Sequence, residues 1–332
     1  MHLSQLLIAI ATFPIVFVGL AVALIFWPVR RPAGFGGAAL ADFRRFVARG
    51  DFAPPPLEQR FVARDGASRA YRLYGSGADL LVFMHGSGGD SAYLARFAEG
   101  LATVAGLRVA TLDMRGHGHA PGVRGDVDRL DRQETDIADL VAALKVDGGG
   151  GRFFIGGHSI GGGLAIRYTA GGQLPRPDGL ILMSPYVSNA APSARPMSGG
   201  WAHARVPRFA GIQMLHRFGI HAFDGLPVVR FAISEAAKTG AETPAYSWRL
   251  FRSVTPREDW KNEIASIACD TLVLGAETDV IFNAEGYRTA FAPNPRARVE
   301  IAQGLGHFDL AMSDFARDRA AAFLRSLMKE EA

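Results

Sequence analysis

A serine flanked by spaced glycines is the first candidate for chemistry in this chain. Residues 157–161 read Gly-His-Ser-Ile-Gly, between an apolar run typical of a buried strand and a stretch typical of a helix. A serine between a strand and a helix would lie in a sharp turn. Side chains two residues before and after it would collide there with the neighbouring strand and helix, so glycine is needed at both positions. The turn would project the hydroxyl of Ser159 from the sheet, where it could attack a carbonyl carbon as a nucleophile.

A serine hydroxyl is a weak nucleophile, so it needs a base, and the base needs an acid that orients it. Late in the chain, the loop after one expected strand carries Glu277 and Asp279, and the loop after the next carries His307. Either carboxylate could orient an imidazole. The order Ser159, Asp279, His307, with each residue after a strand, predicts a catalytic triad.

A second glycine-rich turn can supply electrostatic stabilisation. The expected strand Leu80–Met84 runs into His-Gly-Ser-Gly-Gly at 85–89, before a stretch typical of a helix. Such a turn can direct a backbone N–H at the negative charge that develops on a substrate oxygen. We therefore expect an oxyanion hole formed by the backbone N–H groups of Ser87 and Ile160.

These motifs together resemble those of α/β-hydrolase-fold serine hydrolases, in the group of monoacylglycerol lipases, lysophospholipases and proline-type serine aminopeptidases. The resemblance covers roughly residues 60 to 328. It rests on His-Gly-Ser-Gly-Gly (85–89), Asp-Met-Arg-Gly-His-Gly (113–118), Gly-His-Ser-Ile-Gly (157–161), Gly-Ala-Glu-Thr-Asp (275–279) and Gly-His (306–307). The resemblance implies Asp279, at the end of its Gly-to-Asp turn, as the triad acid in preference to Glu277.

The alternation of expected strands and helices predicts a mostly parallel sheet covered by helices on both faces, and the resemblance implies that this is an α/β-hydrolase fold. We expect the hydrolase domain over 59–332, with an antiparallel hairpin around Asp65-Gly66 at the sheet edge. Residues 186–268 break the alternation and are rich in aromatic side chains. In this fold an insertion there is usually a cap over the nucleophile.

The N-terminal segment is uncharged and apolar from Leu3 to Trp27. A run of this length can cross a hydrocarbon core about 30 Å thick, so we expect a transmembrane anchor over 1–29 and a linker over 30–58. Arginines follow the run, starting with Arg30 and Arg31, and predict a single-pass membrane protein with a cytoplasmic catalytic domain. A cleaved signal peptide is the alternative, although no Lys or Arg precedes the apolar run.

Composition excludes several other classes. The net charge of +4 comes without a basic block or an aromatic ladder, so no nucleic-acid partner is expected. His85, His117, His119 and His158 lack the spacing of a zinc site, so we predict no metal and no cofactor.

The predicted function is hydrolysis of carboxylic esters, with a lipid-like substrate of the monoacylglycerol or lysophospholipid type, through an acyl-enzyme on Ser159. A serine aminopeptidase or amidase would use the same triad, as would acyl transfer to an acceptor other than water. A binding protein that kept the fold without its chemistry is a further alternative.

Overall fold

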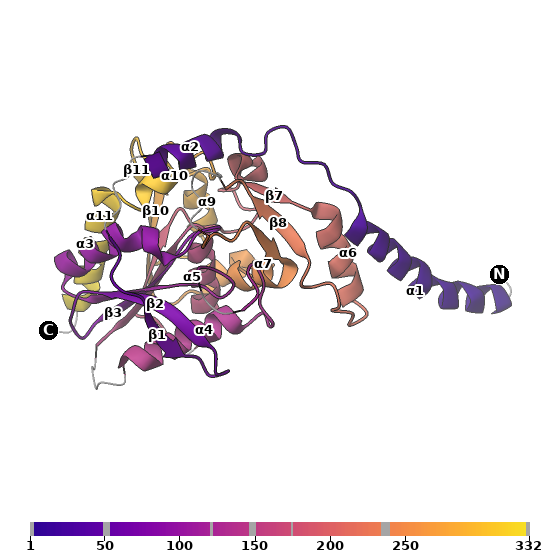
Figure 1. The fold of residues 1–332 in the computed structure, drawn as a ribbon, viewed down its shortest axis with the longest axis horizontal. Helices are drawn as coiled ribbons and strands as arrows, with labels where there is room; N and C mark the ends of the chain where they lie inside the picture. Colours follow the sequence, from indigo (N-terminus) through magenta and orange to yellow (C-terminus); the bar gives the residue numbers. More distant parts are fainter. Residues whose placement is uncertain are drawn as a thin grey trace.

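The computed structural model describes residues 3–48, 54–119, 122–145, 151–173, 175–233 and 240–329, with the side chains described from Thr12 onward. Figure 1 shows a central sheet wrapped by helices, with the N-terminal helix reaching out beside the cap. Residues 49–53 of the predicted linker lie outside the described residues.

Eight strands of the described chain form one mostly parallel sheet, in the order β1-β2-β4-β3-β5-β6-β10-β11. The pairings of β2 with β1 and with β4 are antiparallel, and the others are parallel. The strands are β1 (Gln59–Val62), β2 (Ser68–Tyr74), β3 (Leu80–Met84), β4 (Arg108–Leu112), β5 (Phe153–His158), β6 (Gly179–Met183), β10 (Asp270–Ala276) and β11 (Ala297–Ala302). The predicted parallel sheet and its edge hairpin are confirmed.

Alternate side chains of the strands enter two separate cores. On β3, Leu81 and Phe83 pack with residues of α3 and α11, whereas Leu80, Val82 and Met84 pack with residues of α4 and α5. A strand buried on both faces shows no polar alternation, which explains its continuous apolar sequence. The helices outside the cap that follow β3 are η1 (Ser91–Leu94), α3 (Ala95–Ala105), α4 (Arg132–Lys145), α5 (Ile160–Ala170), α9 (Gly286–Phe291), α10 (His307–Leu310) and α11 (Asp314–Lys329).

The segment expected to form the cap carries a small second sheet, in which β8 pairs antiparallel with β7 and β9. Its elements are η2 (Pro196–Gly200), β7 (Ala202–Ala204), α6 (Val206–His216), β8 (Pro227–Phe231), β9 (Ala245–Ser247), α7 (Trp248–Val254) and α8 (Trp260–Ser266). Two hydrogen bonds join this segment to the turn after β3: Trp201 Nε1 donates to Ser87 Oγ at 2.8 Å, and Thr243 N donates to the Gly88 carbonyl at 2.9 Å. The segment is thereby fixed over the turn expected to hold the oxyanion.

The apolar N-terminal run folds as helix α1 (Leu3–Phe26), which packs along α6 of the cap (Figure 1). Ala21 and Ile25 are fully buried there, and Arg208 Nε donates to the Ile25 carbonyl at 3.0 Å. A Cβ on Gly211 would collide with the Ala21 carbonyl oxygen, so this glycine permits the close approach of the two helices.

The prediction of an N-terminal transmembrane helix is wrong. Over the described part of the chain, no helix combines the length and the apolar character that a membrane crossing requires. Side chains of α1 that we expected to face lipid contact the cap, as when the Phe17 ring lies 5.4 Å from that of Phe218. The cytoplasmic placement that we predicted from the arginines stays a prediction.

The predicted linker contains a helix that the sequence reading missed, α2 (Gly37–Ala48). Phe43 packs against Trp201 at 5.3 Å and against Phe308 at 5.1 Å, and Phe46 packs against Phe308 at 5.5 Å between ring centroids. Phe308 directly follows the predicted base. Helix α2 therefore covers the loop that carries His307.

Candidate active site

Ser159 occupies the sharp turn between β5 and α5 that its glycines predicted. Its backbone has φ 57° and ψ −119°, a region that residues other than glycine rarely adopt. A Cβ on Gly157 would collide with the backbone of Gly161, and a Cβ on Gly161 would lie 2.5 Å from the Met84 carbonyl oxygen. Both glycines are thus required by close backbone approach, as expected from the sequence.

Asp279 and His307 form a buried hydrogen-bonded pair. His307 Nδ1 lies 2.8 Å from Asp279 Oδ2, and both side chains are 1 % exposed. The other carboxylate oxygen accepts from the backbone N–H groups of Ile281 at 2.7 Å and Phe282 at 2.9 Å. Burial would raise the pKa of Asp279, but the charge interaction with His307 and these hydrogen bonds outweigh it, so the pKa lies below its ordinary value.

Glu277, the rival acid, points elsewhere. Its carboxylate is exposed and accepts from the Gly304 backbone N–H at 2.8 Å. Only Asp279 of the two contacts His307. With Asp279 accepting at Nδ1, the Nε2 atom of His307 is left as a proton acceptor. Among the described hydrogen bonds, Ser159 Oγ has none to His307, and such bonds are often long in a protein without substrate.

A hydrogen-bonded chain that the sequence reading missed connects the two turns of the site. Tyr93 Oη accepts from the Gly86 N–H at 2.7 Å and lies 2.8 Å from His158 Nδ1, while His158 Nε2 lies 3.1 Å from the His307 carbonyl oxygen. Burial lowers the pKa of His158 to about 3, so the ring is neutral at physiological pH. His158 Nδ1 therefore accepts a hydrogen bond from the Tyr93 hydroxyl, and its Nε2–H donates to the His307 carbonyl, which supports the backbone of His307.

The two predicted oxyanion donors face one cavity. Ser87, Ser159 and Ile160 all line it, and neither the Ser87 N–H nor the Ile160 N–H has a hydrogen-bond partner within the described chain. Ile160 N–H belongs to the first turn of α5, where backbone donors have no partner inside the helix. The cavity thus presents two free backbone donors beside the serine, which could stabilise an oxyanion.

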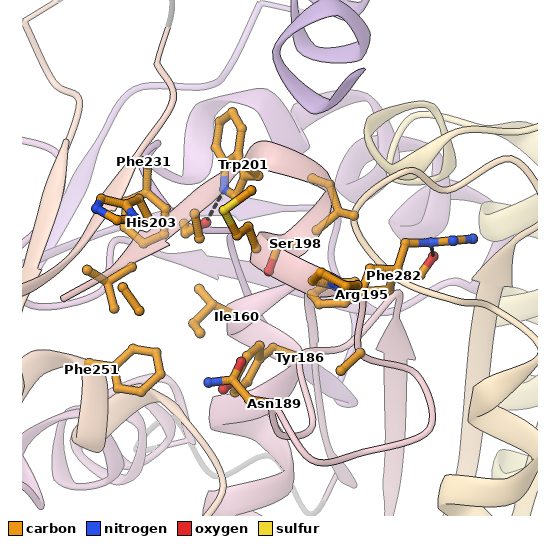
Figure 2. A pocket seen from close by; sticks show the side chains of 18 of the residues that line it. Ile160, Tyr186, Asn189, Arg195, Ser198, Trp201, His203, Phe231, Phe251 and Phe282 are labelled. Carbon is orange, nitrogen blue, oxygen red and sulfur yellow. Dashed lines mark hydrogen bonds between the residues drawn. The ribbon is translucent and has the colours of Figure 1, made fainter. Parts of the chain in front are cut away.

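The cavity has a volume of about 850 Å³ and a mostly apolar lining. Figure 2 shows Ile160 among aromatic side chains, with Tyr186 and Phe251 on one side and Trp201 and Phe231 on the other. These rings come from the segment expected to form the cap and from the loop after β6. The cap therefore supplies most of an apolar compartment over Ser159.

The other histidines singled out in the sequence make hydrogen bonds that suit structural roles. His85 Nδ1 lies 2.8 Å from the Gly86 carbonyl oxygen, and its Nε2 accepts from the Met114 N–H at 3.2 Å. His117 Nε2 lies 2.5 Å from Tyr246 Oη, whereas His119 is exposed. Burial lowers the pKa of His85 and that of His117.

A possible metal group that the sequence reading overlooked lies at the end of α6. His216, His221 and Asp224 offer ligand atoms that are all within 4.8 Å of one another. The Asp224 carboxylate lies 2.6 Å from His216 Nε2 and 3.1 Å from His221 Nδ1, so hydrogen bonds alone account for the arrangement. None of the three lines the cavity at Ser159.

A family model described as serine aminopeptidase, S33, matches residues 76–308, which include Ser87, Ser159, Asp279 and His307. The chain belongs to this family. It is a serine hydrolase, and the predicted resemblance and enzyme class are confirmed. The match begins after β2 and ends just after the predicted base, so it spans the sheet strands from β3 to β11 and the expected cap.

The names of proteins similar to this member of the S33 family state different activities. The provisional carbamate hydrolase RutD of Rhizobium rhizogenes is 28% identical over 251 residues, covering 72% of this chain and 85% of that protein. Protein phosphatase methylesterase 1 of Mus musculus is 26% identical over 168 residues, covering 47% of this chain and 43% of the esterase. A solved monoglyceride lipase of Saccharomyces cerevisiae shares the fold, with a TM-score of 0.61, 17% identity, and coverage of 83% of this chain and 97% of the lipase.

Proposed function

We propose that this S33 hydrolase cleaves carboxylic esters with an apolar acyl chain, through an acyl-enzyme on Ser159. The observation that carries the proposal is the apolar cavity of about 850 Å³ over Ser159, into which Ser87 and Ile160 face with free N–H groups. Cavities of this size and character bind small, largely apolar molecules.

In the proposed mechanism His307 takes the proton of Ser159 as the hydroxyl oxygen attacks the ester carbonyl. The carbonyl oxygen becomes an oxyanion and accepts hydrogen bonds from the N–H groups of Ser87 and Ile160. The intermediate then releases the alcohol, which takes the proton from His307, and leaves the acyl group on Ser159. Asp279 holds Nδ1 of His307 throughout and stabilises the charged imidazole.

Water completes the reaction. His307 takes a proton from a water molecule that attacks the acyl-enzyme. The second oxyanion then collapses, the bond to Ser159 breaks, and His307 returns the proton to the Ser159 oxygen as the carboxylic acid leaves. The aromatic rings around Ile160 would hold the acyl chain during both steps. Since none of the proposed groups needs a metal, we expect no loss of activity on treatment with a chelator.

The lining of the cavity favours an ester substrate over an aminopeptidase substrate. A free amino terminus is cationic at neutral pH, and its burial requires a carboxylate partner. The described residues that line the cavity include Arg30 and Arg195 but neither Asp nor Glu. An ammonium group would therefore meet only like charge beside this cavity.

The test combines active-site labelling with a chain-length series. We expect a fluorophosphonate probe to label the wild type and not Ser159→Ala, and p-nitrophenyl esters to show increasing kcat/KM as the acyl chain lengthens from acetyl to octanoyl. Ser184→Ala is the matched control, because Ser184 also has a positive φ but does not line the cavity. Equal labelling of Ser159→Ala would refute the nucleophile, and a preference for aminoacyl amides would refute the ester assignment.

A further inference from the structure

A cluster of arginines lies at the edge of the cavity. Arg30 and Arg31 follow α1, Arg205 lies between β7 and α6, and Arg230 lies on β8. His203 of β7 stands at the centre of the cluster, because the register of the small sheet pairs it directly with Arg230. We call these four arginines the basic rim.

Ring contacts bring the N-terminal segment into the basic rim. The Arg31 guanidinium lies 5.7 Å from the centre of the Phe35 ring, and the Phe35 ring lies 6.0 Å from that of His203. Arginines far apart in the sequence therefore converge on His203.

No described carboxylate forms an ion pair with an arginine of the basic rim. Elsewhere, acids pair with Arg64, Arg115 and Arg167 at 2.6–2.8 Å. Burial lowers the pKa of the neighbouring His203, and the positive charges of Arg205, Arg31 and Arg230 lower it further.

Arg208, which lies beside the rim, is affected by the same excess of positive charge. It donates to the Ile25 and Pro227 carbonyl oxygens, and its pKa is lowered by burial and by Arg205 and Arg230. Unpaired like charges held together destabilise a fold, so their convergence needs a compensating anion.

The basic rim meets the cavity over Ser159 at Arg30, and its other three arginines lie outside the cavity lining. Arg30 and His203 themselves line that cavity, together with Ser87 and Ile160. Figure 2 shows His203 beside Phe231 on one side of Ile160, whereas Arg195 extends away from Ile160 toward the Phe282 carbonyl, to which its Nε donates at 2.9 Å. An ester held among the aromatic rings could thus extend a charged group to the rim.

We propose that the basic rim binds an anionic group, a phosphate or a carboxylate, on the ester that Ser159 cleaves. Guanidinium groups match the geometry of both anions and remain charged at all working pH values. The proposal rests on the ester hydrolase function proposed above and narrows it to amphiphilic substrates with a hydrocarbon chain and a negative end. Monoacylglycerols, which are neutral, would then be poorer substrates than their anionic counterparts.

The test compares three octanoyl esters of nearly equal size: 1-octanoylglycerol, its 3-phosphate, and 3-octanoylglycerate, in which a carboxylate replaces the free CH₂OH. All are used below the concentration at which they aggregate, so that no lipid surface contributes. We expect kcat/KM of the wild type to be about tenfold higher for an anionic ester than for the neutral one. A preference for both anions indicates recognition of charge, and a preference for the phosphate alone indicates a phosphate site; either supports the proposal.

The variant Arg205→Gln/Arg230→Gln should lose most of that preference, and it should fold because neither side chain has a carboxylate partner to leave behind. Arg217→Gln is the matched control: Arg217 is also an exposed arginine of the cap without a described carboxylate partner, but it lines a different hollow. Raising the salt concentration should lower the rate on the anionic esters in the wild type, independently of any substitution. Equal kcat/KM for the three esters in the wild type, or an unchanged ratio in the double variant, would overturn the proposal.

Failure of the ester hydrolase function can be told apart from failure of the anion site. If the wild type cleaves none of the esters, binding of octanoylglycerol 3-phosphate and of octanoylglycerol to Ser159→Ala is compared by calorimetry. Tighter binding of the phosphate, lost in the double variant, would support the rim without the catalysis. Equal affinities would refute the rim.

Discussion

Substitution of Tyr93 by Phe tests whether the hydrogen-bonded chain between the two turns of the site supports stability and catalysis together. The change removes one oxygen and leaves two buried groups without their partner, the Gly86 N–H and His158 Nδ1. Each unsatisfied buried group costs about 1–3 kcal/mol, so we expect the free energy of unfolding to fall by about 2–4 kcal/mol. In a protein of this size that lowers the Tm by about 3–6 °C.

Catalysis should suffer separately from stability. Gly86 precedes the proposed oxyanion donor Ser87, and His158 bonds the carbonyl of the proposed base His307. A misplacement of 1 Å at an active site can cost about a hundredfold in rate, so a smaller relaxation should lower kcat about tenfold with little change in KM. The assays are thermal unfolding and steady-state kinetics on a p-nitrophenyl ester, measured well below the Tm.

Tyr168→Phe is the matched control for this prediction. Tyr168 is fully buried, but its hydroxyl makes a single hydrogen bond, to the Pro175 carbonyl at 2.9 Å, away from the site. It should cost about 1 kcal/mol of stability and leave kcat unchanged. Wild-type kcat in Tyr93→Phe would refute the link to catalysis, and a Tm equal to that of the wild type would refute the energetic accounting.

Two further predictions concern the acid and the buried histidines. Asp279→Asn should lower kcat on p-nitrophenyl esters by about 10⁴, whereas Glu277→Gln should remain close to wild type, and the reverse order would show that the acid is misassigned. The free energy of unfolding should decrease as the pH falls below about 6.5. At that pH the histidines of the unfolded chain take up protons, whereas burial lowers the pKa values of these histidines in the folded chain and keeps them neutral. The slope should approach about 1.4 kcal/mol per pH unit for each of His117 and His158, with a smaller addition from His85, measured by urea unfolding between about pH 7 and pH 5, and a flat profile would contradict it.

The sequence predicts the serine turn and the sheet well because both depend on local requirements. Gly157 and Gly161 are demanded by backbone contacts that no side chain permits, so they mark the turn wherever it occurs. Strands buried on both faces must be apolar throughout, and β3 begins and ends at the residues predicted for it.

The sequence fails where an apolar surface could have more than one partner. The run in α1 is equally suited to lipid and to a protein neighbour, and only the tertiary structure reveals the contact of Ala21 and Ile25 with α6. Tyr93 and His158 are 65 residues apart, so no local pattern indicates their hydrogen bond. For α2 a signal was present: Phe43 and Phe46 are three residues apart, as expected on one face of a helix.

The path of the N-terminal segment has a mechanical consequence for the cap. The chain leaves α1 on the cap, crosses the basic rim and reaches α2 beside Phe308, and on the way the Gly36 N–H donates to the Gly200 carbonyl at 2.8 Å. If the cap moved away from the sheet as a rigid body, this N-terminal segment would have to extend. Phe43 would then lose its contact with either Trp201 or Phe308. We therefore expect the cap to stay in place during turnover and the substrate to enter at the edge of the cavity beside Arg30.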